Sequence, residues 1–362
     1  MKIINVNLQE NPYKIYIKDN LAKELPLYFN RLNVGNFCFI ITNERIFSLH
    51  KARIKKIVKD TPYKIIKVAE GEKAKSKKWL FKLLEELLNL DKVISRRPFV
   101  VCLGGGTIGD LGGFAASIYK RGIPCIQIPT TLLACVDAAI GGKTAIDLKE
   151  AKNIVGSFYQ PKAVFIDPQF LNTLAAKEIK QGFAEIIKYS LIKDKGLFEK
   201  LKNNYKKIKE FEPGFTEEII ESCVKIKAGI VEKDEREKKG IRTILNFGHT
   251  IGHALEASSG YKKSLNHGES VALGMICAGQ ISLYLKLCPK AIVEKIRALI
   301  KLYKLPLKTS FDREKVIKSF SFDKKFISGS IRMVLIEHIG KTRICEKIPL
   351  KLVKKSLEII RQ

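Results

Sequence analysis

A glycine-rich segment constrains the fold of this chain more than any other feature. The apolar run at 99–103 leads directly into the sequence GGGTIG at 104–109, which has G-x-G-x-x-G spacing and precedes a helical pattern. A strand, a glycine turn and a helix in this order form a phosphate-binding corner, because glycine lets the backbone approach a pyrophosphate near the free amides of the helix N-terminus. We therefore predict a dinucleotide-binding loop within an α/β domain.

The usual acidic ligand for the nucleotide ribose is missing from its expected place. Folds of this kind carry an acidic residue about 20 positions after the loop, but this chain has the stretch QIPT at 127–130. We expect the ribose to be held elsewhere, either by Asn43 or by Glu72 and Lys75.

The pattern around this loop extends the α/β prediction to about residue 175. Apolar runs typical of strands alternate with helical patterns, which favours a largely parallel sheet. A hairpin over 2–7 and 14–17 is expected to precede them. The strand-like runs lie at 36–42, 64–68, 99–103, 124–129 and 163–166, with helical patterns at 43–55 and 77–90.

Beyond Leu174 the strand signal almost vanishes, and long helical patterns follow. At 362 residues the chain is longer than a domain with a single hydrophobic core usually is. We therefore predict two domains, an α/β domain over 1–175 and a mostly helical domain over 176–362, with one short strand at 331–337. The helical patterns lie at 176–209, 216–231, 248–258, 269–287 and 292–303.

The net charge of +29 first suggests a nucleic-acid binder. However, only 13 of the 66 basic residues are arginines, and the lysines are spread along the whole chain. Segments such as 51–56 and 202–207 place lysines at helical spacing beside apolar partners, which is typical of solvated helix faces. We expect no nucleic-acid partner, and a positive field that collects a polyanionic small substrate.

Other features indicate the compartment. The longest apolar stretch, 271–285, is interrupted by glycines and by Gln280 and is too short to span a bilayer, so no membrane partner is expected. The chain opens on a strand pattern with no sign of a signal peptide. Its eight cysteines form no CxxC pair. Together these features favour a reducing cytoplasm.

Three of the five histidines lie within nineteen positions of one another: His249, His253 and His267. His249 and His253 are four residues apart, on one face of a helix. Catalytic Zn²⁺ sites use three protein ligands, commonly neutral imidazoles with a carboxylate. The best carboxylate is Glu185, a charge within an apolar helical stretch. The residues alone predict a metal site that uses both His249 and His253, whereas His50 and His338 have no such neighbours and are interpreted as structural or surface residues.

A set of cations lies in or near glycine-rich turns. Cations beside flexible backbone suit recognition of phosphate or carboxylate groups. The set comprises Arg121, Lys143, Lys152, Lys227, Arg242, Lys324 and Lys325.

Taken together, these motifs resemble the 3-dehydroquinate synthases of the shikimate pathway. The resemblance covers nearly the whole chain. It implies an N-terminal NAD-binding α/β domain, a helical C-terminal domain, and a homodimer with the active site in the cleft between domains. Its blocks are GEK at 71–73, GGGTIGDLGGFAAS at 104–117, YKRGI at 119–123, IPTTLLACVDAAIGGKTAID at 128–147, KNIVGSFYQP at 152–161, GFAEIIKY at 182–189, DERE at 234–237, LNFGHTIGHALE at 245–256 and HGESVALGM at 267–275.

The resemblance assigns the metal, Zn²⁺ or Co²⁺, to Glu185, His249 and His267. This differs from the ligand set predicted from spacing, because it leaves His253 to handle protons or phosphate. The NAD contacts that it implies are Glu72, Lys75, Gly106, Thr107, Ile108, Gly109, Asp110, Thr130, Thr131, Lys143, Lys152, Phe170, Leu171, Asn172 and Thr173.

The resemblance also assigns the substrate, a phosphorylated acid sugar. The carboxylate would contact Lys227 and Arg242, and hydroxyl groups would contact Asp137 and Lys188. Either Lys324 or Lys325 is a further candidate. The phosphate would contact Lys143, Asn153, Asn246 and His253, with Arg121 supplied by the second subunit.

The implied reaction converts 3-deoxy-D-arabino-heptulosonate 7-phosphate to 3-dehydroquinate and phosphate. It proceeds by transient oxidation by NAD⁺, β-elimination of phosphate, re-reduction, ring opening and an intramolecular aldol step. Another sugar-phosphate cyclase and a metal-dependent polyol dehydrogenase are the alternatives. Lys227 and Arg242 favour the acid sugar over neutral sugars, and a dehydrogenase would release NADH without needing this set of cations.

Overall fold

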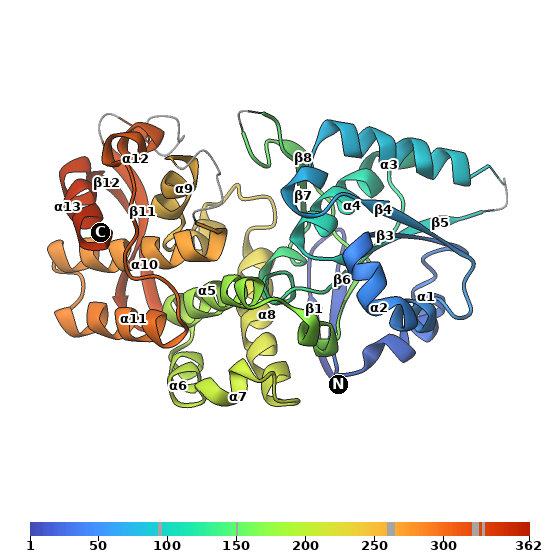
Figure 1. Ribbon diagram of the computed structural model, residues 1–362, viewed down its shortest axis with the longest axis horizontal. Helices are drawn as coiled ribbons and strands as arrows, with labels where there is room; N and C mark the ends of the chain where they lie inside the picture. The colour runs from blue at the N-terminus through green and yellow to red at the C-terminus, as the bar shows by residue number, and fades with distance from the viewer. Residues whose placement is uncertain (93–95, 150, 259–264, 321–325, 328–329) are drawn as a thin grey trace. The chain divides into compact units, whose positions relative to one another are not determined.

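The computed structural model describes residues 1–92, 96–149, 151–258, 265–320, 326–327 and 330–362 (Figure 1). The chain divides into two compact units. Unit 1 comprises Met1–Ala175 and Phe211–Arg236, and unit 2 comprises Ala176–Glu210 and Glu237–Gln362.

We predicted one boundary near residue 175, which places 211–236 in the second domain. The structure instead groups this segment with unit 1, because helix α8 (Phe215–Lys233) packs on strand β1 (Lys2–Val6) and on the short helix Ala134–Ala138. The helical periodicity of α8 specifies an apolar face and does not say which unit buries it.

A seven-stranded sheet forms the centre of unit 1. All of its pairings are parallel except the hairpin β1–β2, so the predicted α/β sheet and leading hairpin are confirmed. The inner strands are buried at every position, as expected for apolar runs in a sheet covered on both faces. The strand order is β1, β2 (Tyr13–Ile17), β9 (Ala163–Ile166), β6 (Cys125–Pro129), β5 (Pro98–Gly104), β3 (Phe37–Asn43) and β4 (Tyr63–Val68).

Helices cover both faces of this sheet (Figure 1). One face packs against α1 (Leu25–Leu32) and α2 (Glu44–Ile57), and the other against α3 (Lys77–Leu90) and α4 (Gly106–Ile118). Successive residues of β5 point alternately into the two cores. Since β5 and β6 are parallel, both of their carboxyl ends lie at one edge, where α4 begins.

Unit 1 also contains a small antiparallel pair that the sequence did not reveal, β7 (Lys143–Ile146) with β8 (Val155–Phe158). Most of β8 is exposed, and it contains a glycine, so it has no apolar alternation to detect. The pair carries Lys143 at one of its ends.

Unit 2 is mostly helical, as predicted. Its central helix, α10 (His267–Tyr284), is buried at nearly every position, because it contacts helices and a strand on several sides. The other helices of this unit are α5 (Ala176–Lys193), α6 (Lys195–Asn203), α7 (Tyr205–Lys209), α9 (His249–Ser258), α11 (Lys290–Leu302), α12 (Arg313–Phe320) and α13 (Leu350–Ile360).

A three-stranded antiparallel sheet completes unit 2, in the order β10 (Phe326–Ile327), β11 (Ser330–His338) and β12 (Lys341–Pro349). The predicted strand at 331–337 is confirmed as β11. Strand β12 was missed because charged and polar residues interrupt its apolar positions.

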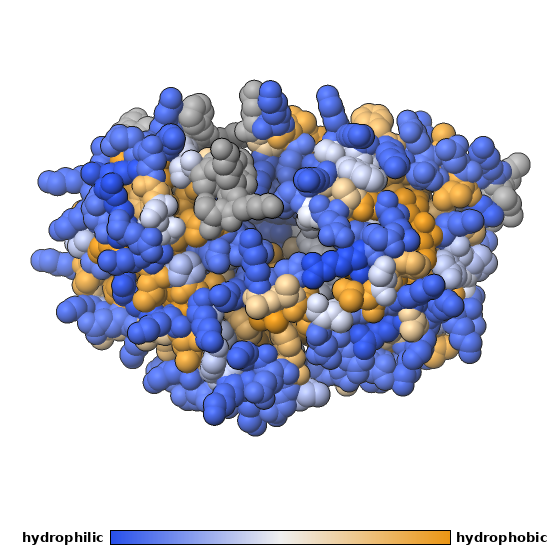
Figure 2. Space-filling view, viewed as in Figure 1, coloured by the Kyte–Doolittle hydropathy of each residue, from blue (hydrophilic) through white to orange (hydrophobic). Residues whose placement is uncertain are grey.

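The surface agrees with the interpretation of the lysines. Hydrophilic side chains cover most of the face shown in Figure 2. Lys55 and Lys56 on α2, and Lys206 and Lys207 on α7, are all exposed. Within the described residues, no helix is both long enough and apolar enough to cross a bilayer.

Candidate functional site

Three helices of unit 2 bring together Glu185 from α5, His249 from α9 and His267 from α10. Their ligand atoms all lie within 4.8 Å of one another. The Nε2 atoms of His249 and His267 lie 3.4 and 3.6 Å from Oε1 of Glu185. Two imidazole nitrogens and a carboxylate oxygen are thus directed at one point, which is the donor set of a catalytic Zn²⁺ site.

Two glycines allow these helices to approach so closely. A Cβ atom at Gly274 of α10 would overlap the carbonyl oxygen of Gly248, the residue before His249. A Cβ atom at Gly268 would lie 2.5 Å from Cα of Gln181 on α5. Any side chain at either position would push α10 away from a neighbour that carries a ligand.

The electrostatics of the cluster favour a bound cation. Glu185 is 1% exposed, and it forms an ion pair with the buried Lys188. Burial alone would raise the pKa of Glu185, but the charge of Lys188 and the contacts with His249 and His267 outweigh it and hold this pKa well below its usual range. Neither carboxylate oxygen receives a hydrogen bond of normal geometry within the described residues. Lys188 compensates the charge of this buried carboxylate. The carboxylate and the two imidazole nitrogens beside it are the ligand types that a divalent metal ion prefers, so the cluster fits such an ion.

The pKa values of the two imidazoles shift in opposite directions when no metal is bound. Burial lowers the pKa of His249. Burial also opposes protonation of His267, but the neighbouring carboxylates of Glu185 and Glu256 outweigh it and raise the pKa of His267 to about 10. A metal ion that binds Nε2 of His267 must therefore displace a proton.

His253 lies beside this cluster and outside it. Its ring centroid is 5.4 Å from that of His249 at an interplanar angle of 86°, and its side chain is exposed. The group of potential ligands that contains Glu185 does not include His253, which instead groups with Glu256 and His267. Spacing alone paired the two histidines on α9, whereas the distances between ligand atoms group His249 with Glu185 and His267.

In unit 1, the predicted dinucleotide loop joins β5 to α4. Gly105 precedes the first turn of α4, and Thr130, which follows β6, donates its backbone N–H to the carbonyl oxygen of Gly104 at 2.9 Å. A Cβ atom at Gly105 would lie 3.0 Å from Cγ2 of Thr131. The glycine loop and the two threonines assigned to NAD are therefore adjacent.

Gln127 explains why no acidic residue occupies the usual ribose position. Its Nε2 donates to the carbonyl oxygen of Gly109 at 3.2 Å, and a Cβ atom at Gly109 would lie 2.8 Å from its Oε1. Gln127 thus joins β6 to the first turn of α4. A carboxylate there would have no proton to donate to that carbonyl.

A second cluster surrounds the buried ammonium of Lys75. Its Nζ lies 2.7 Å from Oδ2 of Asp110 and 4.0 Å from Oδ1 of Asp147, and it also donates to Oδ1 of Asn153. Burial lowers the pKa of Lys75, but the carboxylate of Asp110 outweighs it and raises this pKa. Glu72 is adjacent, since its carbonyl oxygen accepts the backbone N–H of Lys75 at 3.0 Å.

Asp147 is a member of this cluster that sequence reasoning missed. Its Oδ1 accepts the backbone N–H of Asn153 at 2.8 Å, and its own backbone N–H donates to the carbonyl oxygen of Lys75. Asn153 has a left-handed backbone, with φ of 55°. Asp147 lies directly after β7, a strand that the sequence did not reveal, so nothing in the sequence pointed to this carboxylate.

Other predicted cations of the site lie in unit 1 or in unit 2, and their surroundings differ. Nζ of Lys227, on α8, donates to the backbone oxygen and to Oδ1 of Asp137 at 2.7 and 2.8 Å in unit 1. Arg242 is 2% exposed in the segment Ile241–Asn246 of unit 2, with its Nε 3.6 Å from Glu237. Lys143 and Lys152 are exposed in unit 1. Lys324 and Lys325 lie outside the described residues.

The turn Pro168–Thr173 contains the last four residues assigned to NAD, Phe170 to Thr173. His50 of α2 contacts it, with Nε2 3.1 Å from Oγ1 of Thr173 and its ring edge-on to Phe170 at 4.8 Å. His50 is buried and packs against this turn, which agrees with its interpretation as a structural residue.

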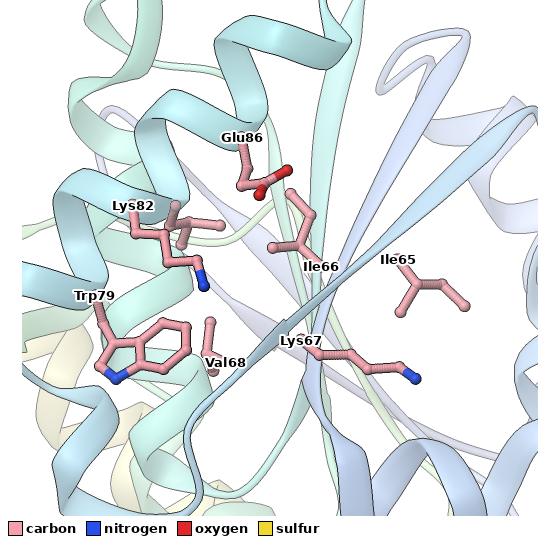
Figure 3. Close-up of a pocket in the computed structure, with 8 residues that line it drawn as sticks. Ile65, Ile66, Lys67, Val68, Trp79, Lys82 and Glu86 are labelled. Carbon is pink, nitrogen blue, oxygen red and sulfur yellow. The ribbon is translucent and has the colours of Figure 1, made fainter.

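A pocket between β4 and α3 is unrelated to these clusters (Figure 3). Its volume of about 120 Å³ is below the range of about 300–1,000 Å³ that is typical of ligand pockets. None of its lining residues is a predicted site residue. They are Ile65, Ile66, Lys67, Val68, Trp79, Lys82, Leu83 and Glu86.

Comparison with known proteins identifies the family. The family model described as 3-dehydroquinate synthase N-terminal matches residues 65–181, and the one described as 3-dehydroquinate synthase C-terminal matches residues 182–326. A 3-dehydroquinate synthase from Clostridium botulinum (strain Alaska E43 / Type E3) is 42% identical over 345 residues, which cover 94% of this chain and 97% of the relative.

Solved structures agree with this match. A 2-deoxy-scyllo-inosose synthase complexed with carbaglucose-6-phosphate, NAD⁺ and Co²⁺ is 25% identical, with a TM-score of 0.85 over 98% of this chain and 99% of the other. A 2-epi-5-epi-valiolone synthase from Streptomyces hygroscopicus with NAD⁺ and Zn²⁺ bound has the same fold, with a TM-score of 0.87 at 24% identity over 98% of each chain. The chain therefore belongs to the 3-dehydroquinate synthase family and has the lyase activity of that family, acting on a phosphorylated sugar.

Proposed function

We propose that this enzyme converts 3-deoxy-D-arabino-heptulosonate 7-phosphate to 3-dehydroquinate and phosphate, with NAD⁺ and with Zn²⁺ or Co²⁺ as cofactors. The observation that carries the proposal is the convergence of Glu185, His249 and His267 within 4.8 Å in a chain that matches both halves of the family. The related inosose synthase and valiolone synthase were solved with NAD⁺ and with Co²⁺ or Zn²⁺.

Separate groups of residues would hold the metal ion and the dinucleotide. Glu185, His249 and His267 would hold the metal ion, and the loop from Gly106 to Asp110 would hold the dinucleotide with Glu72 and Lys75. When bound, NAD⁺ accepts and returns a hydride, while the metal polarises the substrate hydroxyl groups. The further contacts that we assign to NAD are Thr130, Thr131, Lys143, Lys152, Phe170, Leu171, Asn172 and Thr173.

The cations of the chain account for the two anionic groups of the substrate. Lys227 and Arg242 would bind the carboxylate. Both side chains are buried, and a charge-assisted hydrogen bond is stronger where water is excluded. Asp137 and Lys188 would contact hydroxyl groups. The phosphate would contact Lys143, Asn153, Asn246, His253 and Arg121.

The metal assignment has a direct test. Replacing His267 with Ala should remove bound Zn²⁺, measured by elemental analysis after gel filtration, and should abolish phosphate release while the circular dichroism spectrum is unchanged. A fully active His267→Ala enzyme with one ion per chain would exclude this ligand set.

The substrate assignment is tested by phosphate release. Heptulosonate 7-phosphate should be turned over, whereas glucose 6-phosphate and sedoheptulose 7-phosphate, which lack the carboxylate, should not. The absorbance of NADH should stay flat throughout, because the hydride is returned in each turnover. Turnover of a neutral sugar would indicate another sugar-phosphate cyclase, and accumulation of NADH would indicate a polyol dehydrogenase.

We further propose a homodimer in which Arg121 contacts the phosphate bound by the second subunit. Arg121 and the preceding Lys120 both have left-handed backbones, with φ of 64° and 48°, and strained pairs of this kind concentrate at functional sites. Exposed apolar side chains lie nearby on α4 and β8, where the hydroxyls of Ser117 and Ser157 are 2.9 Å apart. These side chains are Ile118 on α4 and Val155 and Phe158 on β8, and Ile154, directly before β8, is exposed as well.

We also place the enzyme in the cytoplasm. All eight cysteines are free, and seven of them are buried, as is usual for a protein of a reducing compartment.

A further inference from the structure

A second carboxylate contacts the metal cluster from the side opposite to Glu185. Glu256 lies on α9, and its Oε1 is 3.5 Å from Nδ1 of His267, while Nε2 of the same ring is 3.6 Å from Glu185. The Glu256 side chain is only 13% exposed. The ring of His267 is thus held between two carboxylates, one at each nitrogen.

When a histidine binds a metal ion, one ring nitrogen carries the proton and the other is the ligand. A neutral imidazole has one N–H, and the metal takes the lone pair of the other nitrogen. An acceptor at Nδ1 keeps the proton there and leaves Nε2 free, and it also fixes the plane of the ring. His249 meets this requirement through the main chain, since its Nδ1 lies 3.2 Å from the carbonyl oxygen of Phe247.

His267 meets the same requirement through a side chain. It is the more exposed of the two ligands, at 32% against 11% for His249. It is also the first residue of α10, so the helix continues on only one side of it. A ring in this position depends on its Nδ1 acceptor for its orientation more than His249 does.

We propose that Glu256 is a positioning residue that accepts the Nδ1–H hydrogen bond of His267, selects the tautomer that exposes Nε2, and thereby tightens metal binding. The inference rests on the proposed ligand set of Glu185, His249 and His267. Glu256 does not itself ligate that ion, because the two nitrogens of an imidazole ring point to opposite sides.

Metal affinity tests this role without any measurement of turnover. Zn²⁺ is titrated into the metal-free enzyme in competition with a chromophoric chelator, for the wild type, Glu256→Ala and Glu256→Gln. Loss of an outer-sphere acceptor typically weakens metal binding by about 10- to 100-fold. We expect a loss of this size for Glu256→Ala. Glu256→Gln should fall between it and the wild type, because the amide oxygen still accepts a hydrogen bond.

A control and a spectrum separate positioning from general damage. Ser258→Ala removes a hydroxyl hydrogen bond to Leu255 on the same helix, and it should leave the affinity unchanged. The visible spectrum of bound Co²⁺ should shift in Glu256→Ala, because the orientation of a ligand changes, and should not shift in Ser258→Ala. Unchanged affinity and an unchanged spectrum in Glu256→Ala would overturn the proposal, as would an equal loss of affinity in both variants.

Glu256 also groups with His253 and His267 as a potential cation site of its own. The titration distinguishes this arrangement, because it predicts two ions per wild-type chain and the loss of one in both Glu256→Ala and His253→Ala. Positioning predicts one ion per chain, with His253→Ala retaining the wild-type affinity. One ion that is retained with wild-type affinity after His267→Ala would contradict the underlying ligand set instead.

Discussion

Neighbouring groups shift the pKa values of two histidines in opposite directions. Burial, with the charge of Arg53 nearby, lowers the pKa of His50 to about 4. Two glutamates raise the pKa of His267 to about 10 despite its burial. The sequence identified His267 by its spacing from other histidines, but it gave no signal for His50, whose partners are 120 or more residues away. Spacing also could not reveal Glu256, because its role depends on which ring nitrogen faces it.

His50 should make the stability of the enzyme depend on pH. Its folded pKa of about 4 lies below the unfolded value of about 6.5, so the unfolded chain binds more protons between these values. The contribution of neutral His50 is fully present above pH 6.5 and is lost as the pH falls through this window toward 4. Urea unfolding of the wild type and of His50→Gln should therefore give free energies that converge as the pH falls. A difference that stays constant from pH 7 to 4.5 would contradict this.

Arg242 should govern the choice between acid and neutral sugars. A charge-assisted hydrogen bond contributes about 1.5–3 kcal/mol, so Arg242→Ala should lower kcat/KM for the heptulosonate by about ten- to a few hundred-fold. An analogue without the carboxylate never makes this contact and should lose far less in binding. The measurement is a pair of inhibition or turnover constants for each enzyme. Equal losses for both compounds would make Arg242 a structural residue.

At the scale of elements, periodicity predicted the strands of the main sheet and most long helices within a few residues. These segments are long and are buried on regular faces, so their own sequence records their structure. The pair β7–β8 and strand β12 were missed because exposed and charged positions break the pattern. Helix α8 was recognised but placed in the wrong unit, since its own sequence does not determine which unit it packs against. The sequence also could not show why Gln127 occupies a position where an acid was expected, because the reason is its hydrogen bond to the carbonyl oxygen of Gly109.

The close contact at Gly274 should control the metal cluster. Gly274→Ala places a methyl group against the carbonyl oxygen of Gly248, and such overpacking typically destabilises by about 1–3 kcal/mol. It should also weaken Zn²⁺ binding, because α9 and α10 would separate. Gly229→Ala on α8 is the matched control, since nothing lies within 4 Å of the added methyl group. It should stabilise the protein by about 0.5–1 kcal/mol, as measured by urea unfolding. Similar effects of the two substitutions would contradict the packing argument.

At the scale of the whole molecule, the proposed dimer predicts that two defective chains restore each other. Arg121→Ala and His267→Ala homodimers should both be inactive or strongly impaired. A heterodimer of the two, purified with separate tags, should regain activity at one of its two sites. That site combines an intact metal cluster with Arg121 of the partner subunit. Activity in the heterodimer no higher than the mean of the two homodimers would show that Arg121 acts within its own chain.

Unit 1 is completed by residues 211–236, which follow the first segment of unit 2 along the chain. During translation, the sheet of unit 1 emerges from the ribosome well before α8, which packs on β1 and on the helix Ala134–Ala138. Lys227 arrives with α8, so its ion pair with Asp137 forms only at that late stage. The packing of α8 on unit 1 and the ion pair between Lys227 and Asp137 therefore form in the same late step of folding. A chain cut after residue 175 would keep the glycine loop and lose both.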